Sequence, residues 1–293
     1  MYLLCLDDHD ALADKLCVGL NAKKLQLEHR LFPDGELYYN LETDVSNQDI
    51  IILCHLHKPN EKALSLWMMA SHLKDMGAKR IGLVAPYLAY MRQDIRFKPG
   101  ECLTSKYFAQ LISEKFDYLI TIDPHLHRYK SLNEIYSIPS KVLHATDTIA
   151  QYIAKLENPL VVGPDEESEQ WAQQVAEKAQ CDYIVLTKIR SGDRDVAIEV
   201  DDIQVYQQHT PVMVDDIIST GRTMLRTAEQ LVKQGLQPPV CIGVHAVFSQ
   251  DAIEEMQQGP IKDVITCNTI PHSSNQIDLS TLIVNGIKEM NHE

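Results

Sequence analysis

The sequence lacks the features that mark secreted, membrane-spanning or zinc-binding proteins. It contains no apolar run of membrane-spanning length, and its first residues, MYLLCLDDHDALADKL, combine a very short apolar run with early acids and no basic segment. Its seven cysteines are scattered, and none belongs to a C-x-x-C pair. We therefore expect no signal peptide, no membrane span, and free thiols in a reducing cytoplasm rather than disulfides or zinc ligands.

Positive charge is also scarce. Lysine and arginine together number 27 against 41 aspartate and glutamate residues, which gives a net charge of −14 and a pI near 5.3. Such a chain is not expected to bind nucleic acid, so any anionic ligand must be held by local donors, helix ends and metal ions. The 293 residues, 45% of them hydrophobic, suffice for two cores of moderate size.

Strand-like apolar runs alternate with helical patterns along the chain. DIIILC precedes the helical ALSLWMMASHLKDMG and then RIGLVAPY, and the second half repeats this rhythm from PLVVGPD onward. The alternation is typical of parallel sheets covered by helices. A weak echo between the segments around Gly77 and Gly235 suggests a repeat of about half the chain. We therefore predict two similar α/β domains, 1–143 and 144–293, without a low-complexity linker.

The stretch PVMVDDIISTGRTMLRTAEQLVKQG ends an apolar run on two adjacent acids, Asp215 and Asp216. Its pattern predicts a strand over Val212–Val214, a turn, and a helix over Met224–Gly235. Serine, threonine and glycine before a helix suit a phosphate, whereas the carboxylates suit sugar hydroxyls or a divalent cation. A ribose 5-phosphate satisfies both demands. The alternative is that Asp216 and Ser219 simply cap the helix.

The segment VMVDDIISTGRT resembles the phosphoribosyl-diphosphate loop shared by type I phosphoribosyltransferases and ribose-phosphate diphosphokinases. Motifs elsewhere resemble the diphosphokinases alone and occur in that family's order: FPDGELYYN, PYLAYMRQDIRFKPGE, TIDPHLH, GPDEE and KIR. The chain therefore resembles the ribose-phosphate diphosphokinase family over most of its length. The resemblance implies two tandem type I phosphoribosyltransferase (flavodoxin-like) domains, with parallel sheets flanked by helices.

The same resemblance implies a reaction. The diphosphoryl group of ATP passes to the anomeric hydroxyl of ribose 5-phosphate, which gives 5-phosphoribosyl 1-diphosphate and AMP with Mg²⁺ as cofactor. This is a transferase step of nucleotide biosynthesis. Domain 1–143 would carry the ATP-side motifs, and domain 144–293 the ribose 5-phosphate loop and the catalytic loop. Family members assemble from dimers, so we expect a homodimer or larger homo-oligomer.

In the first domain, the resemblance implies an ATP site and part of a metal site. Phe32 offers a ring face to adenine, and we expect Asp34 and Glu36 to alternate with it on one side of an extended segment; a plain β-turn is the alternative. The planar guanidinium of Arg92 would stack on the purine or bind phosphate, and a solvated loop at R-Q-D is the alternative. The implied ATP-binding residues are Phe32, Asp34, Glu36, Arg92, Gln93 and Asp94, and the implied metal residues are Asp123, His125 and Asp165.

In the second domain, the catalytic pair implied by the resemblance is Lys188 and Arg190. They lie two apart at the end of the strand-like DYIVLT, and the following SGDRD is typical of a mobile hairpin. Solvated basic side chains are the alternative. The implied ribose 5-phosphate residues are Asp165, Asp215, Asp216, Ser219, Thr220, Gly221, Arg222 and Thr223.

Two departures from the family pattern stand out. Glu166, Glu167 and Ser168 replace a small-residue turn after Asp165, and Ser219 stands where many members have a third acid. Two rival functions remain. A type I phosphoribosyltransferase would not need the first-half motifs, and a non-catalytic regulatory protein associated with the synthetase would not need an intact catalytic pair.

Overall fold

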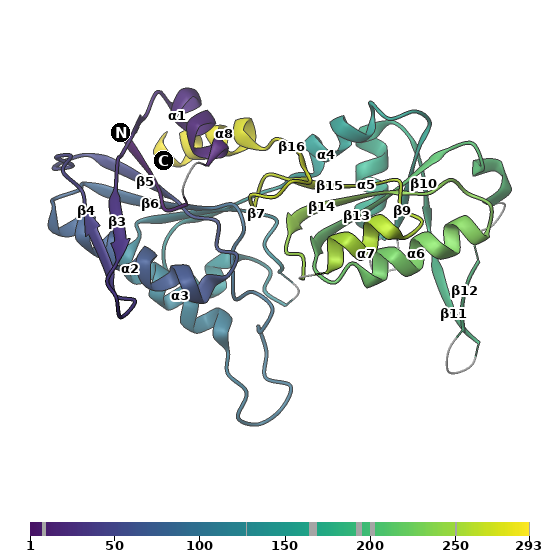
Figure 1. Cartoon of the computed structure of the whole chain (residues 1–293), viewed down its shortest axis with the longest axis horizontal. Coiled ribbons are helices and arrows are strands. Elements are labelled where there is room, and N and C mark those ends of the chain that lie inside the picture. Colours follow the sequence, from purple (N-terminus) through teal and green to yellow (C-terminus); the bar gives the residue numbers. More distant parts are fainter. Residues whose placement is uncertain are drawn as a thin grey trace. The chain divides into compact units, whose positions relative to one another are not determined.

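A computed structural model describes the chain except residues 8–9, 127, 164–168, 192–194, 200–202, 250 and 293 (Figure 1). The chain divides into two compact units. Unit 1 contains Met1–Leu143 and Ser280–Glu293, and unit 2 contains His144–Leu279. Each unit is built around its own six-stranded sheet.

Unit 1 has a parallel sheet with strand order β2-β1-β5-β6-β7-β8. Helices α2 and α3 cover one face of this sheet, and α1 and α8 cover the other (Figure 1). The strands are β1 (Tyr2–Cys5), β2 (Lys23–Lys24), β5 (Asp49–Leu53), β6 (Arg80–Ala85), β7 (Tyr118–Ile122) and β8 (Ser140–Leu143). The helices are α1 (Ala11–Leu20), α2 (Pro59–Asp75), α3 (Thr104–Lys115), the 3₁₀ turn η1 (Leu132–Glu134) and α8 (Ser280–His292), and a separate hairpin is formed by β3 (Glu28–Leu31) and β4 (Leu37–Asn40).

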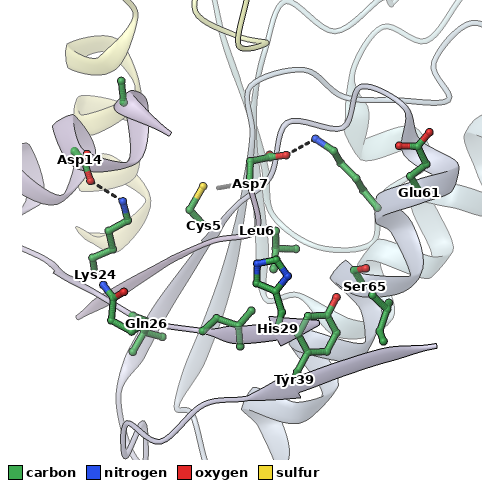
Figure 2. Close-up of a pocket in the computed structure, with 15 residues that line it drawn as sticks. Cys5, Leu6, Asp7, Asp14, Lys24, Gln26, His29, Tyr39, Glu61 and Ser65 are labelled. Atoms are coloured by element: carbon green, nitrogen blue, oxygen red, sulfur yellow. Dashed lines mark hydrogen bonds and ion pairs between the residues drawn. The ribbon is translucent and has the colours of Figure 1, made fainter. Parts of the chain in front are cut away.

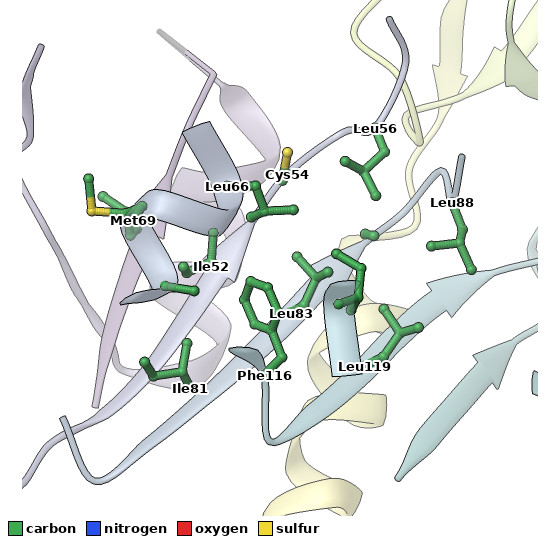
Figure 3. Packing of buried hydrophobic residues seen from close by; sticks show 14 of the residues in the cluster. Ile52, Cys54, Leu56, Leu66, Met69, Ile81, Leu83, Leu88, Phe116 and Leu119 are labelled. Atoms are coloured by element: carbon green, nitrogen blue, oxygen red, sulfur yellow. The ribbon is translucent and has the colours of Figure 1, made fainter. Parts of the chain in front are cut away.

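The core of unit 1 explains why its central strands are continuous apolar runs. Strands of a parallel sheet are covered on both faces, so neither face can be polar. Ile52 of β5, Leu83 of β6 and Leu119 of β7 belong to one fully buried cluster with Leu66 and Met69 of α2 (Figure 3). This packing fixes the carboxyl ends of β5, β6 and β7 along one edge of the sheet.

Unit 2 repeats the arrangement with strand order β10-β9-β13-β14-β15-β16, again all parallel. The strands are β9 (Pro159–Gly163), β10 (Asp182–Val185), β13 (Thr210–Ile218), β14 (Val240–Ala246), β15 (Asp263–Cys267) and β16 (Asn275–Ile277). The helices are α4 (Thr146–Ile153), α5 (Glu169–Ala179), η3 (Ile203–Tyr206), α6 (Arg222–Lys233) and α7 (Ala252–Gln258), and the hairpin is formed by β11 (Thr187–Ser191) and β12 (Asp195–Glu199).

The two sheets share a strand order and insert an antiparallel hairpin at the same point, directly after the strand at one edge. The helices that end before Gly77 and Gly235 also occupy equivalent places, each leading to the fourth strand of its sheet. The predicted fold class, with two parallel-sheet domains flanked by helices, is confirmed. The topology also supports the internal repeat suggested by the sequence.

The structure differs from the predicted domains at the C-terminus. The division falls after Leu143, but α8 belongs to unit 1 rather than to the domain 144–293. Its apolar face is buried at Ile283, Ile287 and Met290, and the helix packs on α1, β7 and β8. A Cβ on Gly286 would lie 2.8 Å from the side chain of Leu143, so a larger residue here would make that side chain move. The helical pattern of the sequence does not reveal which sheet such a helix covers.

None of the helices in the described part of the chain combines the length and apolar character that a membrane span requires.

Candidate functional site

The acid pair of unit 2 lies inside a strand rather than at its end. β13 continues past Val214 to Ile218, because its last residues still pair with β14, as Ile217 does with His245. The prediction that the strand ends at Val214 is therefore wrong. Both acids are half-buried, and the Asp215 carboxylate accepts the backbone N–H of Asp216 at 2.9 Å. Two carboxylates thus stand near the carboxyl end of a central strand, where parallel sheets bind their ligands.

The turn after β13 leads into α6, which begins at Arg222 rather than at the predicted Met224. Gly221 is the N-cap residue, and it has no side chain with which to cap the helix. Neither Asp216 nor Ser219 is therefore the N-cap residue of α6. The first N–H groups of an α-helix have no partner within the helix, which suits them to an anion such as phosphate.

Gly221 cannot be replaced without strain. Its φ is 65°, a left-handed conformation that favours glycine, and a Cβ would lie 2.5 Å from the sulfur of Met256. The backbone of the turn therefore passes closely over α7. This explains physically why a glycine stands between Thr220 and Arg222.

Gly221→Ala is expected to lower the free energy of unfolding by about 2 kcal/mol, because the left-handed strain and the contact with Met256 add together. Thermal or denaturant unfolding measures this change. Gly100→Ala is the matched control, since Gly100 has a φ of 86° but nothing within 4 Å of the added carbon. Equal losses in the two variants would contradict a contribution from Met256.

The predicted catalytic pair lies in a hairpin. β10 ends at Val185, and β11 is a separate strand in which Lys188 pairs with Ile198 and Arg190 with Val196. The pair therefore does not extend the sheet strand, as the sequence predicted, but lies on an antiparallel arm. The side chains of Lys188 and Arg190 lie outside what the structure describes, as does all of Asp165 with its departure at 166–168.

In unit 1, the F-x-D-G-E motif forms the tip of the β3–β4 hairpin. Phe32 N–H donates to the Glu36 carbonyl at 2.8 Å, and Glu36 N–H donates to Asp34 Oδ1 at 3.2 Å. The expected extended segment is therefore wrong, and the turn alternative describes the backbone. All three side chains are exposed, and Arg30 lies 4.8 Å from the centre of the Phe32 ring.

Two further predicted segments lie side by side at one sheet edge. Arg92, Gln93 and Asp94 follow β6, and Asp123 and His125 follow β7, which is the parallel neighbour of β6. Arg92 is exposed and Gln93 half-buried, whereas Asp94 is 9% exposed. The structure thus brings the predicted nucleotide segment next to the predicted metal segment of unit 1. Asp94 differs from Arg92 and Gln93 because its side chain is buried.

Asp123 has a strained backbone. Its φ is 35°, which is unusual for a residue other than glycine, and its N–H donates to the Leu143 carbonyl at 3.0 Å. Such strain persists where surrounding contacts hold the backbone in place, and it is often found at ligand-binding sites. Among the described residues, no three His, Cys, Asp or Glu side chains gather as a metal site.

A hollow of about 510 Å³ lies in unit 1 at the carboxyl end of β1, where the β3–β4 hairpin and the first turns of α2 also line it (Figure 2). Asp7 and Lys62 form an ion pair at 2.5 Å, and Lys62 also donates to the His55 carbonyl at 2.9 Å. Burial, aided by the Lys62 ammonium, lowers the pKa of His57 beside it. In unit 1 the equivalent of β13 is β5, and the residues that follow β5 lack the acid pair and the T-G-x-T turn.

These features define a class of enzyme with a double phosphoribosyltransferase-type fold. One of its two units has an acid pair followed by a glycine turn at the start of a helix, which suits a phosphorylated sugar. A family model for the N-terminal domain of ribose phosphate pyrophosphokinase matches residues 1–115, and one for the phosphoribosyl transferase domain matches residues 131–281. The chain belongs to the ribose-phosphate pyrophosphokinase (diphosphokinase) family.

Individual relatives agree. A ribose-phosphate pyrophosphokinase of Sulfolobus acidocaldarius is 31% identical over 91% of this chain and 92% of its own length. One of Sulfurisphaera tokodaii is 32% identical over 86% of this chain and 87% of its own. Among solved structures, the chain is similar to the crystal structure of phosphoribosylpyrophosphate synthetase from Mycobacterium smegmatis, with a TM-score of 0.85 and 22% sequence identity. The match covers 99% of this chain and 98% of that one, so the two share a fold. The predicted family and enzyme activity are confirmed, and neither rival is favoured.

Proposed function

We propose that this chain binds ATP and ribose 5-phosphate and uses Mg²⁺ to form 5-phosphoribosyl 1-diphosphate and AMP. The observation that supports this best is the end of β13, where Asp215 and Asp216 precede a turn and a helix whose N-cap residue is Gly221. The carboxylates would accept hydrogen bonds from the ribose hydroxyls, and the turn from Ser219 to Thr223 would hold the 5-phosphate. Asp165 would lie beside the ribose.

The nucleotide would occupy unit 1. Phe32, Asp34 and Glu36 at the exposed hairpin tip offer a ring and two acceptors for adenine, and Arg92 and Gln93 offer donors for phosphate. Asp94 is buried and paired with Arg128, so its contribution would pass through that arginine. The anomeric hydroxyl would attack the β-phosphorus of ATP in line, with AMP as the leaving group. The protein would therefore mainly align the two substrates, without forming a covalent intermediate.

The residues present fit magnesium. Mg²⁺ keeps several waters and takes one or two carboxylates together with substrate phosphates, so it does not need three protein ligands gathered in advance. Asp123 would supply such a carboxylate with His125 beside it, and Asp165 would be the second acid. The ion would neutralise charge on the ATP phosphates. Lys188 and Arg190 would neutralise the charge that develops on the transferred group.

Two further proposals concern the setting of the enzyme. All seven cysteines are free thiols, which supports a cytoplasmic location because disulfides are rare there. Membership of a family that assembles from dimers supports a homodimer or larger homo-oligomer. With a net charge of −14, no nucleic acid partner is proposed.

The decisive assay measures AMP. Given ATP, Mg²⁺ and ribose 5-phosphate, the protein is expected to release one AMP for each diphosphorylated sugar formed, because both products come from a single displacement. Chromatography of the nucleotides, with each component omitted in turn as the control, measures this. Consumption of the diphosphorylated sugar only after a free base is added would instead establish a phosphoribosyltransferase.

A further inference from the structure

Arg128 lies in the segment after β7, beyond His125, and none of the sequence motifs includes it. Its Nη1 donates to Asp94 Oδ1 at 3.0 Å, and its guanidinium carbon lies 5.0 Å from the centre of the Phe97 ring. The Asp94 side chain is 4% exposed, whereas that of Arg128 is 46% exposed. A buried carboxylate therefore holds a guanidinium that reaches solvent.

A second set of contacts fixes the same place. The Tyr129 hydroxyl donates to the Asp94 carbonyl at 3.2 Å, and it lies 3.1 Å from the hydroxyl of the buried Ser105 in α3. The segments after β6 and β7 are thus joined through adjacent side chains. Because β6 and β7 are parallel neighbours, this junction lies at the carboxyl edge of the sheet, where ligands of α/β proteins bind.

The guanidinium retains donors for a ligand. Arginine carries five N–H groups in a planar fork, and within the described chain only Asp94 accepts a hydrogen bond from that of Arg128. Its orientation is set in advance by the carboxylate and the aromatic ring, so little side-chain entropy is lost when an anion binds. Arg92 stands two residues from Asp94, which adds a second cation to the same segment. In a chain of net charge −14, local cations of this kind are what a polyanion requires.

We propose that Arg128 donates hydrogen bonds to the phosphates of the nucleotide donor and that Asp94 is a positioning residue that holds it. The identity of the donor as ATP rests on the proposed function, whereas the pairing of Arg128 with Asp94 does not. Arg128 thereby joins the predicted nucleotide segment at Arg92 to the predicted metal segment at His125.

The test compares ATP affinities in the full chain by titration calorimetry with MgATP. Arg128→Met removes the charge but keeps a long side chain on Phe97, and it is expected to weaken ATP binding at least tenfold, since charge-assisted hydrogen bonds are lost. Because this change leaves Asp94 buried and unpaired, the double variant Arg128→Met with Asp94→Asn guards against unfolding. Lys130→Met, which removes an exposed charge from the same segment, is the matched control and should bind ATP like the wild type.

Kinetics separate binding from a merely structural role. In the Arg128→Met variants, the KM for ATP should rise in step with the loss of ATP affinity measured by calorimetry, and the KM for ribose 5-phosphate should stay within about twofold. Asp94→Asn alone should lose less ATP affinity, because the charge of Arg128 is still present. A folded double variant with wild-type ATP affinity, or one that loses ribose 5-phosphate affinity equally, would overturn the proposal. If the wild type releases no AMP, the proposed function fails, but the ATP titration still decides the role of Arg128.

Discussion

Alanine in place of Lys188 or Arg190 is expected to lower kcat by a factor on the order of 10³, because a cation that neutralises charge during phosphoryl transfer acts mainly in the transition state. The KM values for both substrates should move only a few fold. Initial rates of AMP release measure these changes. The double variant should fall short of the product of the two losses, since both charges act on one centre.

The controls for this pair are simple. Lys233→Ala removes an exposed charge from the last turn of α6 and should leave kcat unchanged. Thermal stability should also stay near that of the wild type in all these variants, because a two-stranded arm contributes little to the core. Near-normal turnover in either single variant would remove that residue from the mechanism.

Replacing Asp215 and Asp216 together by asparagine is expected to weaken ribose 5-phosphate binding at least tenfold. Each carboxylate is a charge-assisted acceptor worth about 1.5 to 3 kcal/mol, so even a partial loss of both exceeds a tenfold change. The backbone contact survives, because an asparagine oxygen can still accept the N–H of residue 216. Titration calorimetry with ribose 5-phosphate measures the effect, and ATP affinity should change much less.

Glu229→Gln, an exposed acid on α6, controls for the general loss of negative charge near this strand. If the double asparagine variant folds and binds the sugar phosphate as tightly as the wild type, the acid pair does not hold the ribose hydroxyls.

The architecture could be predicted because its signal is repeated and local. Buried parallel strands must be apolar on both faces, so runs such as DIIILC and PLVVGPD between amphipathic helices indicate the sheets directly. The residues at which strands end could not be predicted as well. β13 extends through Asp215 and Asp216 because the neighbouring β14 is long enough to pair with it, and that partner is invisible in the local pattern.

The candidate site could be predicted only in part for a similar reason. The turn around Gly221 carries its own chemistry in consecutive residues, so the sequence indicates it. Arg128 acquires its place from Asp94, which lies more than thirty positions earlier, and sequence spacing does not show that pairing. The one signal available was a lone arginine shortly after the D-P-H motif in an acid-rich chain.

The C-terminal helix α8 has a consequence for how the protein is made. It buries Ile283, Ile287 and Met290 against α1, β7 and β8, all of which are synthesised before the whole of unit 2. The ribosome therefore releases His144–Leu279 as a continuous stretch that can complete its own sheet, while the earlier unit still exposes an apolar face. Unit 1 begins to be translated before unit 2, but it can complete its packing only after α8 has been synthesised.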